Sequence, residues 1–194
     1  MHRKRHLPAA IAAACLLLTA TACDGDPDPQ GSTPTSTPPS TPTPTPSKTG
    51  VAPPTMPPAA RGGFNVTSAE AFARFYVAAI DYAQATGDVR LMQQWQDPKR
   101  CVNCKSIATT YAQTYRNGGT VAGQLGTKIV QTTEARLIDD DIAVVKFKTH
   151  SGRTSWRKTA QSKPINLPGG AGDWEFALQI ISGRWMMSEV VIKE

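Results

Sequence analysis

The sequence predicts an α+β domain over residues 63–194, and three features of the chain point to it. All thirteen aromatic residues lie at or after Phe64, whereas twelve of the sixteen prolines lie between Pro27 and Pro58. Within the aromatic region, apolar residues first follow helical spacing and then, after Gly126, recur with a period of two. A run of helices followed by a run of strands is typical of α+β proteins, so we expect a curved antiparallel sheet that folds over the helices.

Residues 1–22 have the anatomy of a secretory signal peptide. A basic start is followed by an apolar run over residues 7–18, which is shorter than the roughly 20 apolar residues that a bilayer-spanning helix needs. Small residues, Ala20 and Ala22, stand at positions −3 and −1 before Cys23. The segment resembles a bacterial lipoprotein signal, in which the thiol of Cys23 receives a diacylglycerol and becomes the mature N-terminus. The alternative is ordinary cleavage before Cys23, because the Ala-x-Ala pattern satisfies that peptidase as well.

The number of cysteines favours the lipid. Cleavage leaves Cys23, Cys101 and Cys104, an odd number for an oxidising compartment. If Cys101 and Cys104 pair, acylation gives Cys23 a separate fate. We therefore expect an extracytoplasmic protein that is held on the cell membrane by a lipid anchor with acyl chains such as palmitate.

Residues 23–62 are predicted to be a disordered linker. Residues 24–60 contain twelve Pro and twelve Ser or Thr and no aromatic residue, and such a segment cannot bury enough apolar surface to fold. It therefore acts as a stalk between the membrane and the domain. The domain itself is only mildly basic and has no basic run or zinc-finger spacing, so nucleic acid is not expected as a partner, whereas a cell-envelope protein or a wall polymer is compatible with this charge.

Three helices open the domain. The pair Thr67 and Glu70 predicts a capping box for the first helix, which Gly87 ends. Asp88 can cap a short second helix, which Pro98 terminates, and a third helix is predicted over about residues 104–115, with 117–119 as its stop.

Five strands follow, predicted over residues 127–138, 141–150, 153–160, 173–181 and 184–193. Trp174, Phe176, Leu178 and Ile180 alternate with polar residues, so one face of the sheet is buried. Short turns such as Ser182-Gly183 fit tight hairpins between neighbouring strands.

This order of helices and long strands resembles the cone-shaped NTF2-like (nuclear transport factor 2-like) superfamily over essentially all of residues 63–194. Residue patterns also resemble an actinobacterial lipoprotein family that contains domain of unknown function 6318. These patterns are Pro57-Pro58-Ala59-Ala60, Ala69-Glu70-Ala71-Phe72, Tyr82, Thr86-Gly87-Asp88, Asp97-Pro98 before Cys101-x-x-Cys104, Gly118-Gly119, Gly172-Asp173-Trp174 and Arg184-Trp185-Met186-Met187. The resemblance implies a compartment and an architecture, with N-terminal helices packed in a curved sheet, but no activity.

Cys101-Val102-Asn103-Cys104 is the sharpest local motif. We expect a structural disulfide that braces the turn after Pro98, with little gain in entropy because the closed loop is so short. A redox pair would need a low-pKa thiolate in a thioredoxin-like setting, which the predicted meander of strands does not provide. A metal site would need more ligands, and His150 is the only histidine left in the domain. We therefore expect neither a metal nor another cofactor.

Two further sets of side chains are candidate sites. Lys146, Lys148 and His150 share one strand face that could receive an anion, although a solvated strand face is the commoner explanation for such residues. Enzymes of the NTF2-like superfamily work inside the cone with a carboxylate base, and Glu189 followed by Glu134 are the candidate acids for such a cavity. Asp81 is predicted to face away from the apolar stripe of the first helix.

We interpret the sequence as a membrane-anchored extracytoplasmic lipoprotein whose domain is a binding or interaction module without a catalytic residue. The alternative is a small-ligand-binding or enzymatic domain that uses the cone cavity, and a third interpretation is a thiol-disulfide redox protein.

Overall fold

The computed structural model describes residues 50–193. The predicted signal peptide over residues 1–22, Cys23 and the linker up to residue 49 lie outside the described residues. Within residues 50–193, no helix has both the length and the apolar character that crossing a membrane requires.

Four helical segments open the described region. They are the 3₁₀ helix η1 (Pro58–Arg61) and the α-helices α1 (Val66–Thr86), α2 (Arg90–Gln94) and α3 (Val102–Arg116). The sequence predicted the three α-helices, but it placed the capping box of α1 two residues too late. Asn65 accepts a hydrogen bond from the backbone N–H of Ser68 at 2.9 Å, and the Ser68 hydroxyl accepts one from the backbone N–H of Asn65 at 3.2 Å. Asparagine at the N-cap position is as effective as threonine, so the helix begins before Thr67.

Seven strands follow in two connected sheets. The larger has the antiparallel order β2 (Thr127–Asp139), β3 (Ile142–Ser151), β6 (Gly170–Ile181) and β7 (Arg184–Lys193). The smaller has the order β1 (Gly118–Gly123), β4 (Thr154–Thr159) and β5 (Ile165–Leu167). All five predicted strands are present. The strand β1 was predicted as a helix stop because of its two glycines, and β5 was not predicted because prolines flank its three residues.

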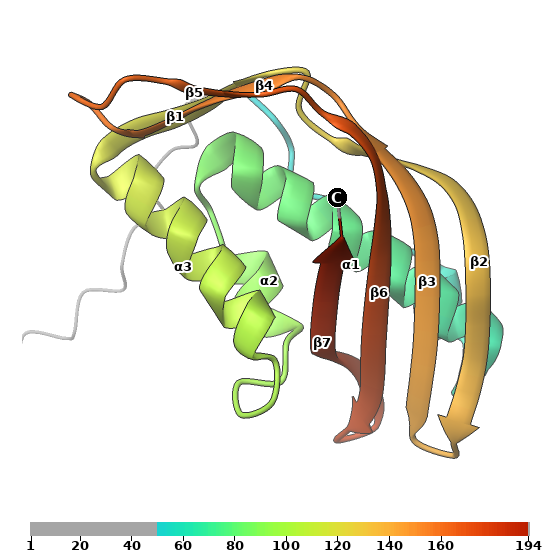
Figure 1. Ribbon diagram of the computed structural model, residues 1–194. Coiled ribbons are helices and arrows are strands. Elements are labelled where there is room, and N and C mark those ends of the chain that lie inside the picture. The colour runs from blue at the N-terminus through green and yellow to red at the C-terminus, as the bar shows by residue number, and fades with distance from the viewer. Residues whose placement is uncertain (1–49, 194) are drawn as a thin grey trace, which may run out of the picture. The chain divides into compact units, whose positions relative to one another are not determined.

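The larger sheet bends sharply into the smaller one (Figure 1). Glycines in the connections between strands form a line along this bend. Chain segments pass from one sheet to the other three times, between β1 and β2, between β3 and β4, and between β5 and β6. At this line a Cβ on Gly152 would collide with Gln124, and a Cβ on Gly169 would collide with backbone atoms of Ser151 and Gly152. The close approach of three strands at the bend therefore requires residues without side chains.

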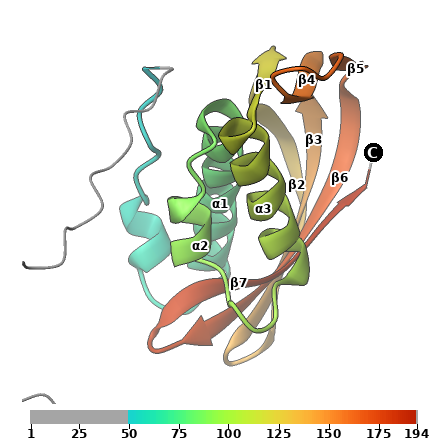
Figure 2. The same cartoon turned by 90° about the vertical axis from the view of Figure 1, so that its left-hand side faces the viewer.

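The helices α1, α2 and α3 lie on the same side of the larger sheet (Figure 2), and α1 contacts all four of its strands. Trp174, Phe176 and Leu178 are buried, as their alternation predicted. The largest fully buried side chains come from both layers and fill the space between α1 and the sheet: Phe72, Tyr76, Met92, Val145, Phe147, Phe176, Leu178, Met187 and Val190.

The segment between α2 and α3 covers the free edge of β7. The backbone N–H of Asp97 donates to the Met187 carbonyl at 2.7 Å, and the N–H of Met187 donates to the Trp95 carbonyl at 2.8 Å. Gln96 thereby forms an isolated parallel bridge with Met187. This pairing protects an edge strand that would otherwise present unpaired backbone groups, and it fixes Trp95 beside the β6–β7 hairpin.

Candidate functional site

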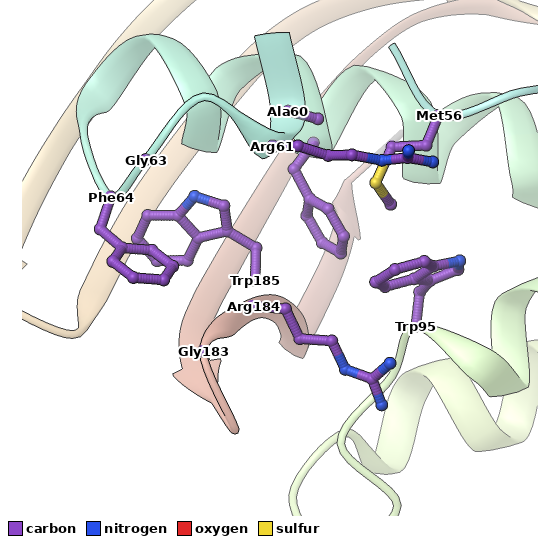
Figure 3. A pocket seen from close by; sticks show the side chains of 10 residues that line it. Met56, Ala60, Arg61, Gly63, Phe64, Trp95, Gly183, Arg184 and Trp185 are labelled. Carbon is purple, nitrogen blue, oxygen red and sulfur yellow. The ribbon is translucent and has the colours of Figure 1, made fainter. Parts of the chain in front are cut away.

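A pocket of about 300 Å³ lies between the start of α1 and the β6–β7 hairpin (Figure 3). The 3₁₀ helix η1 and the residue that ends α2 form its other walls. Its lining is mostly apolar and aromatic: Met56, Ala60, Arg61, Gly63, Phe64, Phe72, Trp95, Gly183, Arg184 and Trp185. The pocket is thus built from four separate segments and lies at one end of the filled interior.

The hairpin turn positions the central aromatic residue. Ser182 and Gly183 both have positive φ angles, 52° and 72°, which is the geometry of a two-residue hairpin turn that matches the twist of the strands. Trp185 follows directly and is 2% exposed, and its indole N–H donates to the Ser68 hydroxyl at 3.0 Å. Ser68, the N3 residue of the α1 capping box, therefore also fixes the orientation of this indole ring.

Two other rings complete the aromatic wall. Phe64, which is 47% exposed, meets Trp185 edge to face with the ring centroids 5.9 Å apart. Trp95 packs against Phe72 with the centroids 6.0 Å apart. An exposed phenylalanine beside a buried tryptophan leaves apolar surface accessible at the mouth of the pocket.

Two arginines add positive charge to this wall. The guanidinium carbon of Arg184 lies 5.3 Å from the centre of the Trp95 ring, which is a cation–π contact. Arg61 reaches the pocket from η1 (Figure 3). Sequence reasoning did not find this site, because its lining residues come from segments that are far apart in the sequence.

Glu189, the first predicted cavity acid, does not point into the interior. The pairing of β6 with β7 shifts by one residue between Leu178–Met187 and Ala177–Glu189, so that Ser188 is a bulge. The bulge changes the phase of the alternation. Before it, the odd-numbered residues Trp185 and Met187 face the core, and after it the even-numbered Val190 does, so Glu189 does not. The carboxylate of Glu189 instead accepts a hydrogen bond from the Asn103 side chain at 2.8 Å.

Glu134, the second predicted acid, lies among basic residues. It forms ion pairs with Arg136 and with Lys146, the latter at 2.9 Å. The hydrogen bonds from Arg136 and then from Lys146 hold the pKa of the Glu134 carboxyl below its ordinary value. A carboxylate with this lowered pKa is a poor general base.

The predicted anion-binding face has its own carboxylates. Lys146 lies between Glu134 and Glu175, and Lys148 pairs with Asp173 at 2.7 Å. His150 is exposed and lies opposite Lys128 on β2. The two lysines are therefore neutralised by their cross-strand neighbours.

Asp81, which the sequence predicted to face away from the apolar stripe of α1, contacts the start of β2. Its carboxylate accepts hydrogen bonds from the backbone N–H of Thr127 at 2.8 Å and from the Thr127 hydroxyl at 2.9 Å. Burial raises the pKa of the Asp81 carboxyl, and these two hydrogen bonds only partly oppose that effect. The residue joins α1 to the start of β2, because its side chain reaches the bend of the sheet.

Cys101 and Cys104 form a disulfide at the start of α3. Cys101 is the N-cap residue, and its sulfur accepts a hydrogen bond from the backbone N–H of Cys104. The two residues are 3% and 0% exposed and belong to the core. Neither sulfur is accessible in the way that thiol exchange requires. Among residues 50–193 there is no group of three or more histidine, cysteine or acidic residues that could hold a metal ion.

Comparisons with known proteins inform the family and the fold. The model of a "Family of unknown function (DUF6318)" matches residues 42–191. A comparison with curated proteins finds no match.

Solved structures resemble the chain at low sequence identity. The intermembrane space region of the chloroplast protein ARC6 has a TM-score of 0.51 and 11% identity, covering 66% of this chain and 96% of that one. A ketosteroid isomerase-like protein from Erwinia carotovora atroseptica has a TM-score of 0.43 and 19% identity, covering 66% and 93%. An NTF2-like protein of unknown function from Prochlorococcus has a TM-score of 0.32 and 11% identity, covering 45% and 60%. At these identities the likeness concerns the fold alone.

Proposed function

Because this chain belongs to the DUF6318 family of unknown function, we propose a function from its own residues: an exported, lipid-anchored binding module with an NTF2-like cone. Its ligand site is the pocket between η1, α1 and the β6–β7 hairpin. The observation that carries the proposal is an apolar, aromatic pocket beside an interior that side chains already fill. Pockets of this kind, apolar with a few polar groups at fixed positions, are typical of small-ligand sites.

The filled interior favours binding over catalysis in a cone cavity. Phe72, Phe147 and Phe176 are at most 1% exposed and occupy the space that a substrate would need. The two predicted acids, Glu189 and Glu134, contact Asn103 and basic side chains and do not line the pocket.

Export and anchoring rest on the sequence and on the disulfide. The apolar run, the small residues before Cys23 and the proline-rich segment describe a lipoprotein on a stalk. A buried disulfide between Cys101 and Cys104 is compatible with an oxidising compartment. A domain held in this way meets ligands at the outer surface of the membrane.

The test uses the four tryptophans as separate reporters. The chain from residue 23 onward, carrying Cys23→Ser so that no acyl chain interferes, is titrated with the neutral aromatic probe 2-naphthamide while the indole N–H signals are followed by NMR. We expect the signals of Trp95 and Trp185 to move with saturation, because both rings line the pocket. The signals of Trp156 and Trp174, which lie outside it, should stay in place.

A matched pair of variants checks the location of the probe. Phe64→Ala removes a pocket wall that is 47% exposed, and Ile138→Ala removes a side chain that is 49% exposed at the far end of β2. We expect Phe64→Ala to weaken probe binding about tenfold, since about 1.4 kcal/mol of apolar contact is lost, and Ile138→Ala to leave it unchanged. No saturable shift at Trp95 and Trp185, or equal shifts at all four indoles, would overturn the pocket as the ligand site.

A further inference from the structure

We propose that the pocket selects a small organic carboxylate, with a planar or apolar body that lies against the tryptophans and an anionic end held by Arg61 and Arg184. This inference rests on the proposed function and adds the chemical class of the ligand. It starts from the charges of the pocket, which are two guanidinium groups and no carboxylate among the lining residues.

Arg61 and Arg184 take part in none of the ion pairs within residues 50–193. The basic partners in the ion pairs of this part of the chain are Arg74, Arg90, Arg100, Arg136, Lys146 and Lys148. Asp81 and Glu189, in turn, accept hydrogen bonds from the uncharged residues Thr127 and Asn103. The pocket therefore carries two positive charges, and none of the ion pairs within residues 50–193 neutralises them.

The geometry of Arg184 favours a planar anion. Its guanidinium lies beside the Trp95 ring (Figure 3), and the contact of 5.3 Å restricts the side chain without using its hydrogen-bond donors. A guanidinium presents N–H groups in a fixed fork that matches the two oxygens of a carboxylate.

The size of the pocket limits what can bind. A volume of about 300 Å³ is at the lower end of the range for small-molecule sites, which is roughly 300–1,000 Å³. This space suits a ligand of one or two rings, or a short apolar chain, with the carboxylate at the open side. A polyanion would instead need a continuous basic surface, and on the outer sheet face Lys146 and Lys148 are already paired with acids.

The experiment compares two probes that differ only in charge. The chain from residue 23 onward with Cys23→Ser is titrated with 2-naphthoate and with its neutral isostere 2-naphthamide, again with the indole signals of Trp95 and Trp185 as the readout. We expect 2-naphthoate to bind about tenfold more tightly, because a charge-assisted hydrogen bond to arginine adds to the shared apolar contact. Raising the salt concentration should weaken 2-naphthoate binding and leave 2-naphthamide binding unchanged.

Single charge removals locate the effect. Arg184→Gln and Arg61→Gln should each reduce the preference for 2-naphthoate over 2-naphthamide severalfold. The control is Arg116→Gln, which removes the same charge from the exposed end of α3, away from the pocket, and should keep the full preference. Folding of each variant is checked by the dispersion of the four indole signals.

Three outcomes would overturn the inference, and they separate it from the proposed function. Equal affinity of the two probes, with shifts at Trp95 and Trp185, removes the carboxylate and leaves the pocket as a ligand site. If Arg116→Gln abolishes the preference for 2-naphthoate as strongly as Arg184→Gln does, the preference comes from net charge and not from the pocket. Absence of binding by both probes removes the proposed ligand site together with this inference.

Discussion

At the scale of single residues, the most informative side chain is Asp81, which is partly buried between α1 and the start of β2. Its two acceptor contacts both go to Thr127, so the residue is a local connection and not part of the pocket. Since burial raises the pKa of the carboxyl, the folded state favours the protonated form more than the unfolded state does. The stabilising contribution of this group is therefore fully present below its unfolded pKa and is lost as the pH rises through its folded pKa.

The direction of this pKa shift predicts how two substitutions at Asp81 change the free energy of unfolding. Asp81→Asn keeps an oxygen for the Thr127 N–H and offers an N–H to the Thr127 hydroxyl, but it carries no charge. We expect its free energy of unfolding at pH 7 to equal or exceed that of the wild type, with the difference shrinking as the pH falls and the wild-type carboxyl becomes protonated. Asp81→Ala should lose about 1–3 kcal/mol at neutral pH, because the Thr127 N–H then lacks an acceptor.

Urea unfolding at several pH values measures both variants. A wild type that gains stability relative to Asp81→Asn as the pH falls below neutrality would support the sign derived above. The prediction fails if the difference between the two proteins is the same at pH 7 and at low pH, since protonation of Asp81 would then not be linked to folding.

At the scale of elements, the junction of α1 and α2 depends on one glycine. Gly87 ends α1 in the left-handed region, with φ of 75°. It also lies against Tyr115, whose ring a Cβ at position 87 would overlap. The Tyr115 hydroxyl in turn donates to the carbonyls of Gln84 and Ala85 at 2.7 and 2.8 Å, so α3 is fastened to the end of α1 at this point.

We predict that Gly87→Ala lowers the free energy of unfolding by about 2–4 kcal/mol. About 1–2 kcal/mol comes from the left-handed backbone of a residue with a side chain, and the rest from displacing the Tyr115 ring. Gly183→Ala is the matched control, because Gly183 has a similar φ of 72° but nothing within 4 Å of the added Cβ. The control should lose only the backbone part, and equal losses in urea unfolding would show that the contact with Tyr115 is not costly.

The elements also show where sequence reasoning succeeds and where it does not. The predicted helices and strands are present because apolar spacing and turn residues determine them locally. The inward position of Trp174, Phe176 and Leu178 follows from the same pattern. The bulge at Ser188 has no such signal, because it depends on the register with β6, and it carries Glu189 away from the interior. A prediction based on strict alternation cannot find such a change of phase.

At the scale of the whole molecule, the pocket illustrates the same limit. The sequence predicted an α+β domain, and the helices and antiparallel strands of the structure agree with it. The pocket, however, brings together Arg61, Trp95 and Arg184, which are far apart in sequence. Their proximity depends on the bridge between Gln96 and Met187 and on the hairpin turn at Gly183. Aromatic residues on predicted helices and strands indicate burial, but they do not indicate which of them will border a pocket.

The anchor proposed for the N-terminus remains a prediction, and its two interpretations differ in a measurable mass. If Cys23 is acylated, the N-terminal peptide of protein purified from membranes carries a diacylglycerol on its thiol, and the protein enters the detergent phase on phase separation. The physical reason is the transfer of acyl chains from water, worth about 0.8 kcal/mol for each buried methylene. Cys23→Ala should abolish the added mass, whereas Cys15→Ala, within the apolar run that precedes the cleavage site, should retain it.

Ordinary cleavage would instead give a wild-type chain that begins at an unmodified Cys23 and stays in the aqueous phase. That result would leave the pocket and its ligand chemistry untouched but would make the domain a freely released protein. The mass of the N-terminal peptide decides directly between a tethered and a released binding module, because partitioning alone could also report an uncleaved signal segment.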